Sequence, residues 1–96
     1  MDIRVVHNQA ASRFEATIDG ALARADYRLE EGVMQIFHTE VPRQLEGLGI
    51  AAAIVAVAMN HARENGLRVA PRCSYVRTYM RRHPETRVLL ADGYAL

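Results

Sequence analysis

Alternating apolar and polar residues predict β-strands over the first forty residues. Between Arg13 and Ile18 the apolar side chains fall on one face of an extended chain and the polar ones on the other. Asp19-Gly20 follows, a strong signal for a two-residue hairpin turn because both turn positions need a positive φ. We expect an antiparallel meander with a second turn at 30–32 and strands at 3–6, 13–18, 21–29 and 33–41.

A helical period replaces this alternation after Pro42, which has no N–H group to continue a β-ladder. The pattern predicts a loop over 43–48 and a buried helix from Gly49 or Ile50 to about Asn65, closed by Gly66. One face of that helix would carry Ile50, Ile54, Val57, Ala58 and His61. The expected remainder is a strand at 67–70, a helix from Cys73 or Ser74 to about His83, and a short apolar piece at 88–90, after which the chain is expected to fray.

These elements predict an α/β fold in a single domain spanning 1–96, because 96 residues are too few for two domains. The strand, helix and strand at 33–70 form a βαβ unit, whose strands should be parallel and whose crossover should be right-handed. We therefore expect a mixed, mostly antiparallel sheet of about five strands with two main helices.

Charge and composition exclude several function classes. The formal net charge is only +1, so no bulk attraction to nucleic acid or to a membrane is expected. Residues 49–96 carry seven Arg against three acids, which suits a polyanionic ligand or arises by chance. The longest apolar run, at 48–59, is too short to span a bilayer. A single cysteine and the lack of a signal-peptide pattern fit a cytoplasmic protein, and the histidines show no metal-ligand spacing.

The segment from Gln44 to Ala51 carries the clearest chemical signal. Gly47 and Gly49 stand between a predicted strand and a predicted helix, where glycine lets the backbone turn tightly. The first N–H groups of a helix have no internal partners, so the turn would offer an anion site suited to a pyrophosphate. A plain loop-to-helix turn is the alternative. The segment is not a P-loop, and Ala52 stands where a dinucleotide fingerprint needs glycine.

The sequence around this segment resembles that of a known family. Gln44, Gly47 and Gly49 form Q-x-x-G-x-G, which is similar to the signature of the GNAT acetyltransferases. Thr39-Glu40-Val41-Pro42, then Pro71-Arg72-Cys73-Ser74-Tyr75-Val76, then Tyr79 to Glu85 resemble the short GNAT-like branch of that superfamily. The resemblance covers roughly residues 13–90. Residues 7–12 form only a turn where a full-length member has two helices, so the acceptor half of the site is reduced.

The resemblance implies a function as well as a fold. It implies a reduced GNAT-like domain that binds acetyl-CoA without a metal and transfers the acetyl group to an amine acceptor that stays unidentified. The pyrophosphate would lie on the backbone N–H groups of the loop, and the N–H near Val41 would polarise the thioester carbonyl. The cofactor-binding segment would comprise Gln44, Leu45, Glu46, Gly47, Leu48, Gly49, Ile50 and Ala51.

The resemblance also suggests catalytic candidates, each with an alternative. Glu40 would take a proton from the incoming amine, or be a solvated charge or a partner for Arg43. Tyr79 would protonate the departing CoA thiolate, or be a packing residue. Tyr75 lies four residues earlier on the same face of the predicted helix and is easily confused with Tyr79.

Cys73 and the arginines of the last helix are further candidates. Cys73 stands near a helix N-terminus with Arg72 and Arg77 nearby, which favours a nucleophilic thiolate. A small buried residue beside the CoA sulfur is the interpretation we prefer. Arg77 and Arg82, with Arg81, would reach the CoA phosphates or form a solvated basic face.

The remaining histidine candidates and two other functions stay open. His83 is either an acid–base group or, as we expect, the residue that ends a helix, and His38 on a strand is either an acid–base group or structural. The alternative functions are a CoA-binding module with little or no catalysis, used for sensing or protein contact, and a small interaction domain without a CoA site.

Overall fold

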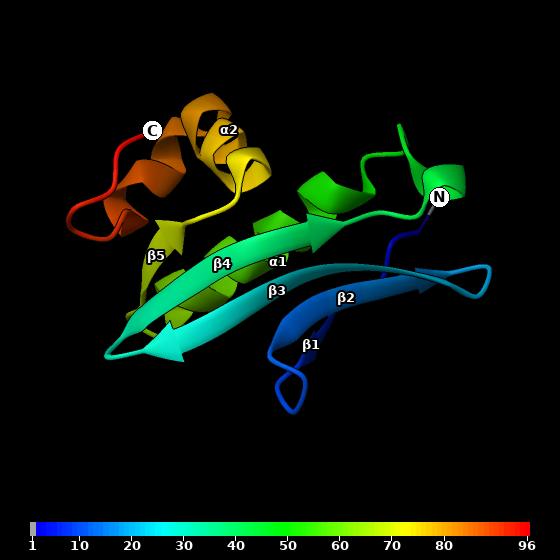
Figure 1. The fold of residues 1–96 in the computed structure, drawn as a ribbon, viewed down its shortest axis with the longest axis horizontal. Coiled ribbons are helices and arrows are strands. Elements are labelled where there is room, and N and C mark those ends of the chain that lie inside the picture. The colour runs from blue at the N-terminus through cyan, green and yellow to red at the C-terminus, as the bar shows by residue number, and fades with distance from the viewer. Residues whose placement is uncertain (1) are drawn as a thin grey trace.

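The computed structural model describes residues 2–96 as a five-stranded sheet with α1 packed against one face (Figure 1). The strands follow chain order in the sheet; β1 to β4 are antiparallel, and β5 runs parallel to β4. This confirms the α/β class and the mixed sheet. The elements are β1 (Val6–Asn8), β2 (Arg13–Ile18), β3 (Ala21–Glu30), β4 (Val33–Glu40), a 3-10 turn (Arg43–Leu45), α1 (Ile50–Glu64), β5 (Arg68–Pro71), α2 (Ser74–Arg82) and a second 3-10 segment (Pro84–Leu89).

The hairpin turns form where the sequence predicted them. Asp19 and Gly20 both have positive φ, 51° and 78°, and join β2 to β3. Glu31 and Gly32 repeat the arrangement between β3 and β4, with φ of 49° and 79°. Such left-handed pairs match the twist of the strands that they connect.

The first strand was predicted to begin three residues and to end two residues too early. The apolar residues Ile3 and Val5 suggested a strand at 3–6, but the paired residues are Val6 to Asn8, which face Glu15 to Arg13 of β2. The side-chain oxygen of Asn8 accepts a hydrogen bond from the Ala11 N–H at 3.1 Å and helps to close the turn. The position of this turn sets the register of the pairing, whereas the apolar residues pack against the core from outside the ladder.

A β-bulge interrupts the ladder between β3 and β4. Tyr27 pairs with Ile36 and Asp26 with His38, so Phe37 is an extra residue with no partner on β3. An extra residue shifts the alternation of side chains between the two faces. Consequently Thr39 lies on the same face as Ile36, towards α1, rather than on the opposite one.

The buried face of α1 differs in part from the predicted one. Val57 and His61 are only half-buried, and their places in the core are taken by neighbours one or two positions along. The fully buried positions are Ile50, Ile54, Val55, Ala58, Met59 and Ala62. Gly66 has φ of +65° and follows the helix as predicted, and the Leu67 N–H bonds to the Ala62 carbonyl at 2.9 Å. No helix within residues 2–96 is long and apolar enough to cross a membrane.

Fraying was expected after the apolar piece at 88–90, but the first residue beyond it, Ala91, is still anchored to β5. After the 3-10 segment, Leu90 bridges to Val69 of β5, and the Ala91 N–H bonds to the Val69 carbonyl at 2.8 Å. Leu89 and Ala91 are buried. This segment covers the outer edge of β5, which would otherwise present unpaired backbone groups.

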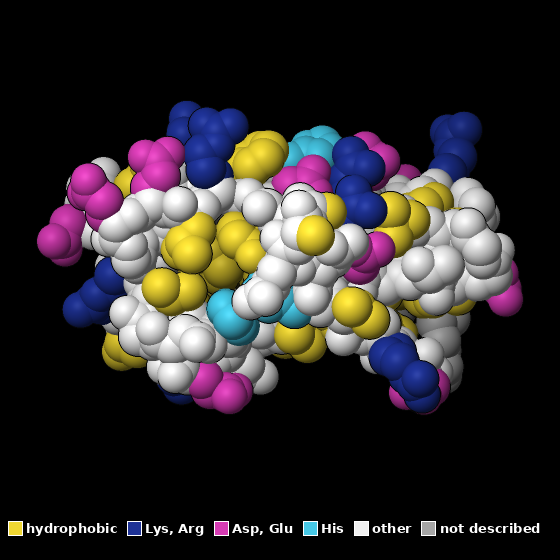
Figure 2. All heavy atoms as spheres, turned by 90° about the horizontal axis from the view of Figure 1, so that it is seen from below, with side chains coloured by type: hydrophobic (Ala, Val, Ile, Leu, Met, Phe, Trp, Pro, Cys, Tyr) yellow, Lys and Arg dark blue, Asp and Glu magenta, His cyan; other side chains and the backbone are white. Residues whose placement is uncertain are grey.

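A cluster of aromatic and histidine rings joins β1, β2 and β3 to α1. The His7 ring stacks on Phe14 at 4.1 Å between centroids, and its Nε2 lies 2.7 Å from the Tyr27 hydroxyl. His61 meets the His7 ring edge-on at 4.4 Å. Figure 2 views the molecule from this side and shows histidine side chains beside hydrophobic ones at the surface. Burial, and secondly the neighbouring His61, lower the pKa of His7 below its usual 6.5.

The lowered pKa of His7 predicts that the protein is less stable in mild acid. Between the folded-state pKa and 6.5 the unfolded chain binds the proton that the folded protein resists, so the free energy of unfolding falls as pH falls through this window. The melting temperature should therefore drop below pH 6.5. His7→Phe, which keeps the stacking surface, should flatten the dependence, while His38→Asn at an exposed strand position should not. Equal slopes in wild type and His7→Phe would contradict the assignment.

Candidate functional site

A cleft of about 310 Å³ lies where the end of β4, the start of α1 and the start of α2 meet. The loop that contains Gly47 and Gly49 (the glycine loop) and the first turn of α1 form one wall. The last residues of β4 and a tyrosine of α2 form the other. The lining residues are Thr39, Val41, Leu45, Glu46, Gly47, Gly49, Ile50, Ala51, Ala52 and Tyr75. Figure 1 shows β4 and β5 diverging towards this end of the sheet.

The glycine loop has the conformation that the sequence predicts. Gly47 and Gly49 have φ of +79° and +78°, which side chains rarely adopt. A Cβ atom at either position would meet nothing within 4 Å, so backbone conformation rather than crowding demands glycine here. The same open space allows another molecule to approach the bare backbone closely.

The N–H groups of this loop divide into two sets. Those of Leu45 and Glu46 are already used, because they donate to the carbonyls of Pro42 at 2.8 Å and Arg43 at 3.2 Å. These two N–H groups of the predicted binding segment are therefore not available to an anion. From Gly47 to Ala52 the N–H groups have no backbone acceptor within the described part of the chain, and Gly49 caps α1 without a side-chain bond. Free N–H groups at the positive end of a helix favour an anion.

Cys73 is the N-cap of α2 and faces the end of β4. Its Sγ lies 3.5 Å from the Thr39 hydroxyl. Burial by itself raises the pKa of the thiol, but the hydrogen bond with Thr39 and the nearby N–H groups of Val76, Tyr75 and Thr39 outweigh it, so the pKa of Cys73 is lowered. The half-buried thiol therefore bridges β4 and α2 just beyond the last pairing of β4 with β5.

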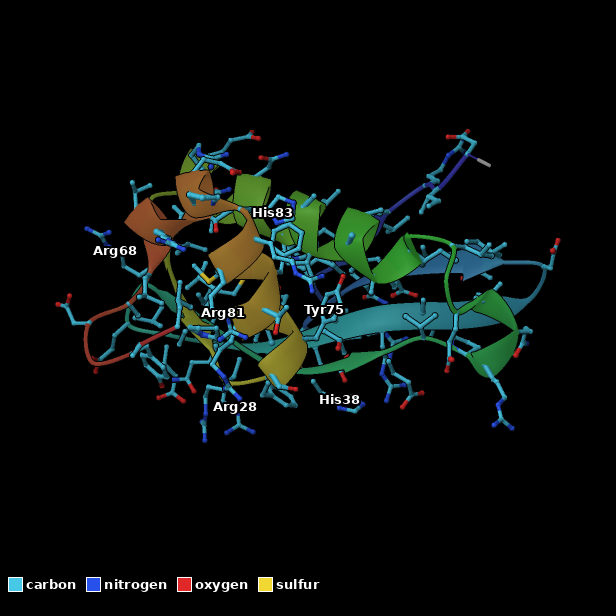
Figure 3. The ribbon with its side chains drawn as sticks, turned by 90° about the horizontal axis from the view of Figure 1, so that it is seen from above. Arg28, His38, Arg68, Tyr75, Arg81 and His83 are labelled. Carbon is cyan, nitrogen blue, oxygen red and sulfur yellow. The ribbon has the colours of Figure 1, made fainter. Side chains whose placement is uncertain are left out.

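The two tyrosines of α2 occupy different places. Tyr75 lines the cleft and lies between α1 and β4 in Figure 3. Tyr79, one turn later, is 9% exposed, stacks on the His83 ring at 3.9 Å between centroids and does not line the cleft. Burial raises the pKa of both hydroxyls, and Arg82 partly offsets this for Tyr75. His83 ends α2 as expected, with its Nδ1 2.8 Å from the Tyr79 carbonyl.

Glu40 lies on the face of the sheet away from α1, because the bulge at Phe37 sets its direction. Its carboxylate is 3.3 Å from His38 Nε2 and 3.6 Å from Arg24 Nη2. The expected alternative partner, Arg43, is not among these contacts. His38 and Glu40 thus form an exposed acid–base pair on the opposite side of β4 from Thr39 and Val41.

The other residues predicted to bind CoA lie outside the lining of the cleft. Arg77 donates from Nη1 to the Pro71 carbonyl at 3.2 Å, which directs it towards β5. Arg82 is exposed and close enough to Tyr75 to influence its pKa. Gln44 is exposed on the 3-10 turn and outside the lining set. Among residues 2–96 no cluster of three or more His, Cys, Asp or Glu could hold a metal ion.

Sequence reasoning left three lining residues out of the predicted site. Ala52 could have been included, because it belongs to the first turn of the predicted helix. Tyr75 was recognised as the same-face neighbour of Tyr79, but a helical period cannot tell which of two residues one turn apart reaches a cleft. Thr39 reaches the cleft only because of the bulge, which no local pattern announces.

Comparison with known proteins agrees with this geometry. Residues 13–89 match the model of the family described as GCN5-related N-acetyl-transferase. Protein NATD1 of Xenopus tropicalis is 31% identical over 85 residues, covering 85% of this chain and 78% of the relative, and human Protein NATD1 is 29% identical over 85% and 75%. The NMR structure of a GCN5-like protein from Staphylococcus aureus superposes with a TM-score of 0.72 at 26% identity, covering 94% of this chain and 87% of that one. The chain therefore belongs to the GCN5-related N-acetyl-transferase family.

Proposed function

We propose that this protein is an acetyl-CoA-dependent N-acetyltransferase that acts on an amine. The observation that carries the proposal is the run of free N–H groups from Gly47 to Ala52, which lines a cleft at the diverging ends of β4 and β5. The membership of the family supports the same reading, since N-acetyl transfer is the activity in the family's description.

The chain's own residues suit a bound pyrophosphate. The N–H groups of Gly47, Leu48, Gly49, Ile50 and Ala51 would donate to its oxygens, and the α1 dipole would add positive potential. Glu46 is the one acid among the lining residues, and its exposed side chain can turn into solvent. Leu45 and Glu46 would contribute shape rather than backbone hydrogen bonds. Arg82 is the arginine of α2 best placed to reach a CoA phosphate.

The transfer step can be written with these groups. Glu40, directly or through a water shared with His38, accepts a proton from the amine. The amine nitrogen attacks the thioester carbon, whose oxygen is polarised by the Val41 N–H, and the carbon–sulfur bond breaks. The departing thiolate takes a proton from a tyrosine of α2. We assign this proton to Tyr75, which lines the cleft, with Tyr79 as the rival.

Cys73, which packs behind the lining residue Thr39, is proposed as a structural neighbour of the site and not as the acyl carrier. Its Sγ is half-buried and hydrogen-bonded to Thr39, so its direct surroundings are those of a packed side chain. Its lowered pKa keeps nucleophilic catalysis chemically open. Direct transfer to the amine needs no such intermediate, and it is the route that we propose. A cytoplasmic location stays a prediction from the single cysteine.

A CoA-binding module with little catalysis is the second candidate. The short turn at residues 9–12 between β1 and β2 favours it, because it leaves little structure to enclose an acceptor. Glu40 also lies exposed and held by Arg24, not enclosed in the cleft. Such a module would bind acetyl-CoA through the same loop and would release no thiol when amines are added.

Two measurements on the wild-type protein test the proposal. Acetyl-CoA at a hundred times its dissociation constant should stabilise the fold by about 2.7 kcal/mol, which raises the melting temperature by on the order of 10 °C in a domain of this size. Amine-dependent release of the CoA thiol should then be detectable with a thiol reagent. Stabilisation without thiol release across an amine panel would favour the binding module, and a folded protein with no stabilisation would refute both candidates.

A further inference from the structure

The face of the sheet away from α1 carries a polar hollow that the transfer site does not use. Its volume is about 270 Å³, and it is lined by Arg28 of β3, Gln35 and Phe37 of β4, and Arg72, which directly follows β5. Figure 3 shows Arg28 and His38 projecting from this face, opposite to α1 and Tyr75.

The two arginines of this hollow differ from their neighbours on the sheet. Arg13 and Arg24 are paired with Glu15 and Asp26 on their own strands, each at 3.2 Å. Within residues 2–96, neither Arg28 nor Arg72 has an acidic side chain at ion-pair distance.

Uncharged groups hold the two guanidinium groups in place. That of Arg28 lies over the Phe37 ring, 5.6 Å from its centroid. Arg72 donates from Nη1 to the Gln35 side-chain oxygen at 3.0 Å. Because that oxygen accepts from Arg72, the amide nitrogen of Gln35 is left as a further donor.

The nearest acids do not neutralise the hollow. Asp26 and Glu30 stand two residues before and after Arg28 on β3, and side chains two apart share a face. Asp26 is engaged by Arg24. Glu30 lines an adjoining hollow, which shares Gln35 with this one and also contains Arg68. The hollow itself is therefore lined by two guanidinium groups and an amide donor and by no acid. Such donors suit a carboxylate ligand.

The hollow adjoins the point where the sheet opens. The Arg72 N–H bonds to the Ile36 carbonyl at 3.0 Å, beyond the last pairing of β4 with β5. Phe37 is the bulge residue, and Glu40 follows it by three positions on the same face. Three residues of extended chain cover about 10 Å, which is the separation of Glu40 from Phe37, the lining residue of the hollow nearest to it along β4. An amine at Glu40 and an anion at this end of the hollow would therefore be several bonds apart.

We propose that this arginine hollow (Arg28, Gln35, Phe37 and Arg72) binds the carboxylate of the acceptor. The acceptor is then an amine that carries a carboxylate about six bonds from its nitrogen, as in an ω-amino acid, and it approaches from the face of the sheet opposite to α1. The inference rests on the proposed function for the direction of the acceptor, but binding of the carboxylate can be measured without it.

The first test is an NMR titration in the absence of acetyl-CoA. The probes are 6-aminohexanoate and its neutral isostere 6-aminohexanamide, which differ only in the carboxylate. The carboxylate probe should shift the side-chain N–H signals of Arg28 and Arg72 and bind about tenfold more tightly than the amide, as expected for a charge-assisted contact. Equal affinities, or shifts that map elsewhere, would overturn the proposal.

Arg28→Gln and Arg72→Gln supply the second test. Both positions are exposed, so the fold should persist, and each variant should lose most of the preference for the carboxylate probe. Arg63→Gln, on the exposed face of α1, removes the same charge and should keep the preference for the carboxylate probe. In the thiol-release assay, the KM for 6-aminohexanoate should rise about tenfold in Arg72→Gln, with the KM for acetyl-CoA unchanged. If both variants kept the preference for the carboxylate probe, the proposal that the hollow binds a carboxylate would be refuted. Failure of acetyl-CoA to bind would refute only the proposed function.

Discussion

Gly47→Glu should abolish the rise in melting temperature that acetyl-CoA gives to the wild-type protein. A glutamate side chain would add a negative charge beside the free N–H groups, where the pyrophosphate is expected. Like charges in this position repel, and the side chain also fills the approach to the backbone. The wild-type shift of on the order of 10 °C at saturating ligand should fall to nearly zero.

Gly32→Glu is a matched control for this experiment. Gly32 and Gly47 share a φ of +79°, and a Cβ at either position meets nothing within 4 Å. Both variants therefore carry the same added charge and a comparable backbone strain of roughly 1–2 kcal/mol. Gly32 lies in the β3–β4 turn, away from the cleft lining, so its variant should melt lower yet keep the full ligand shift. A ligand shift preserved in Gly47→Glu would remove the loop from the binding site.

Tyr75→Phe should reduce kcat about a hundredfold, with a much smaller effect on the KM for acetyl-CoA. Loss of a positioned general acid has typically this size, equivalent to about 2.7 kcal/mol in the barrier. Burial raises the pKa of Tyr75, so the hydroxyl holds its proton at neutral pH and can give it to a departing thiolate. The aromatic ring remains, so the wall of the cleft should be preserved. Steady-state kinetics with a competent amine measure both parameters.

Tyr79→Phe separates this role from simple packing. The two tyrosines stand one helical turn apart and both have raised pKa values, but only Tyr75 lines the cleft. Tyr79→Phe should therefore keep most of the activity. If instead Tyr79→Phe loses two orders of magnitude and Tyr75→Phe does not, the proton donor is the residue that the sequence resemblance indicated, and the cleft extends deeper along α2 than its lining residues suggest.

Sequence signals carried by a few neighbouring residues were sufficient to predict the hairpin turns, the helix α1 and the family. Asp19-Gly20 and Gly32 predicted their turns, because positive φ is a property of single residues. The helical period and Gly66 located α1 to within a residue or so. The linked motifs around Gly47, Gly49 and Tyr79 indicated the family that the comparison confirmed.

Contacts between distant segments decided the rest. The bulge at Phe37 depends on how β4 pairs with β3, and it turns Thr39 and Val41 into the cleft and Glu40 out of it. Ala91, just after the apolar piece at 88–90, is anchored by its bond to Val69, between residues more than twenty positions apart. A repeating pattern of apolar residues shows that a residue will be buried. Which residue it packs against depends on strand register and on loop closure. For that reason the sequence alone indicated the chemistry of the glycine loop, and the tertiary structure decided which side chains share its cleft.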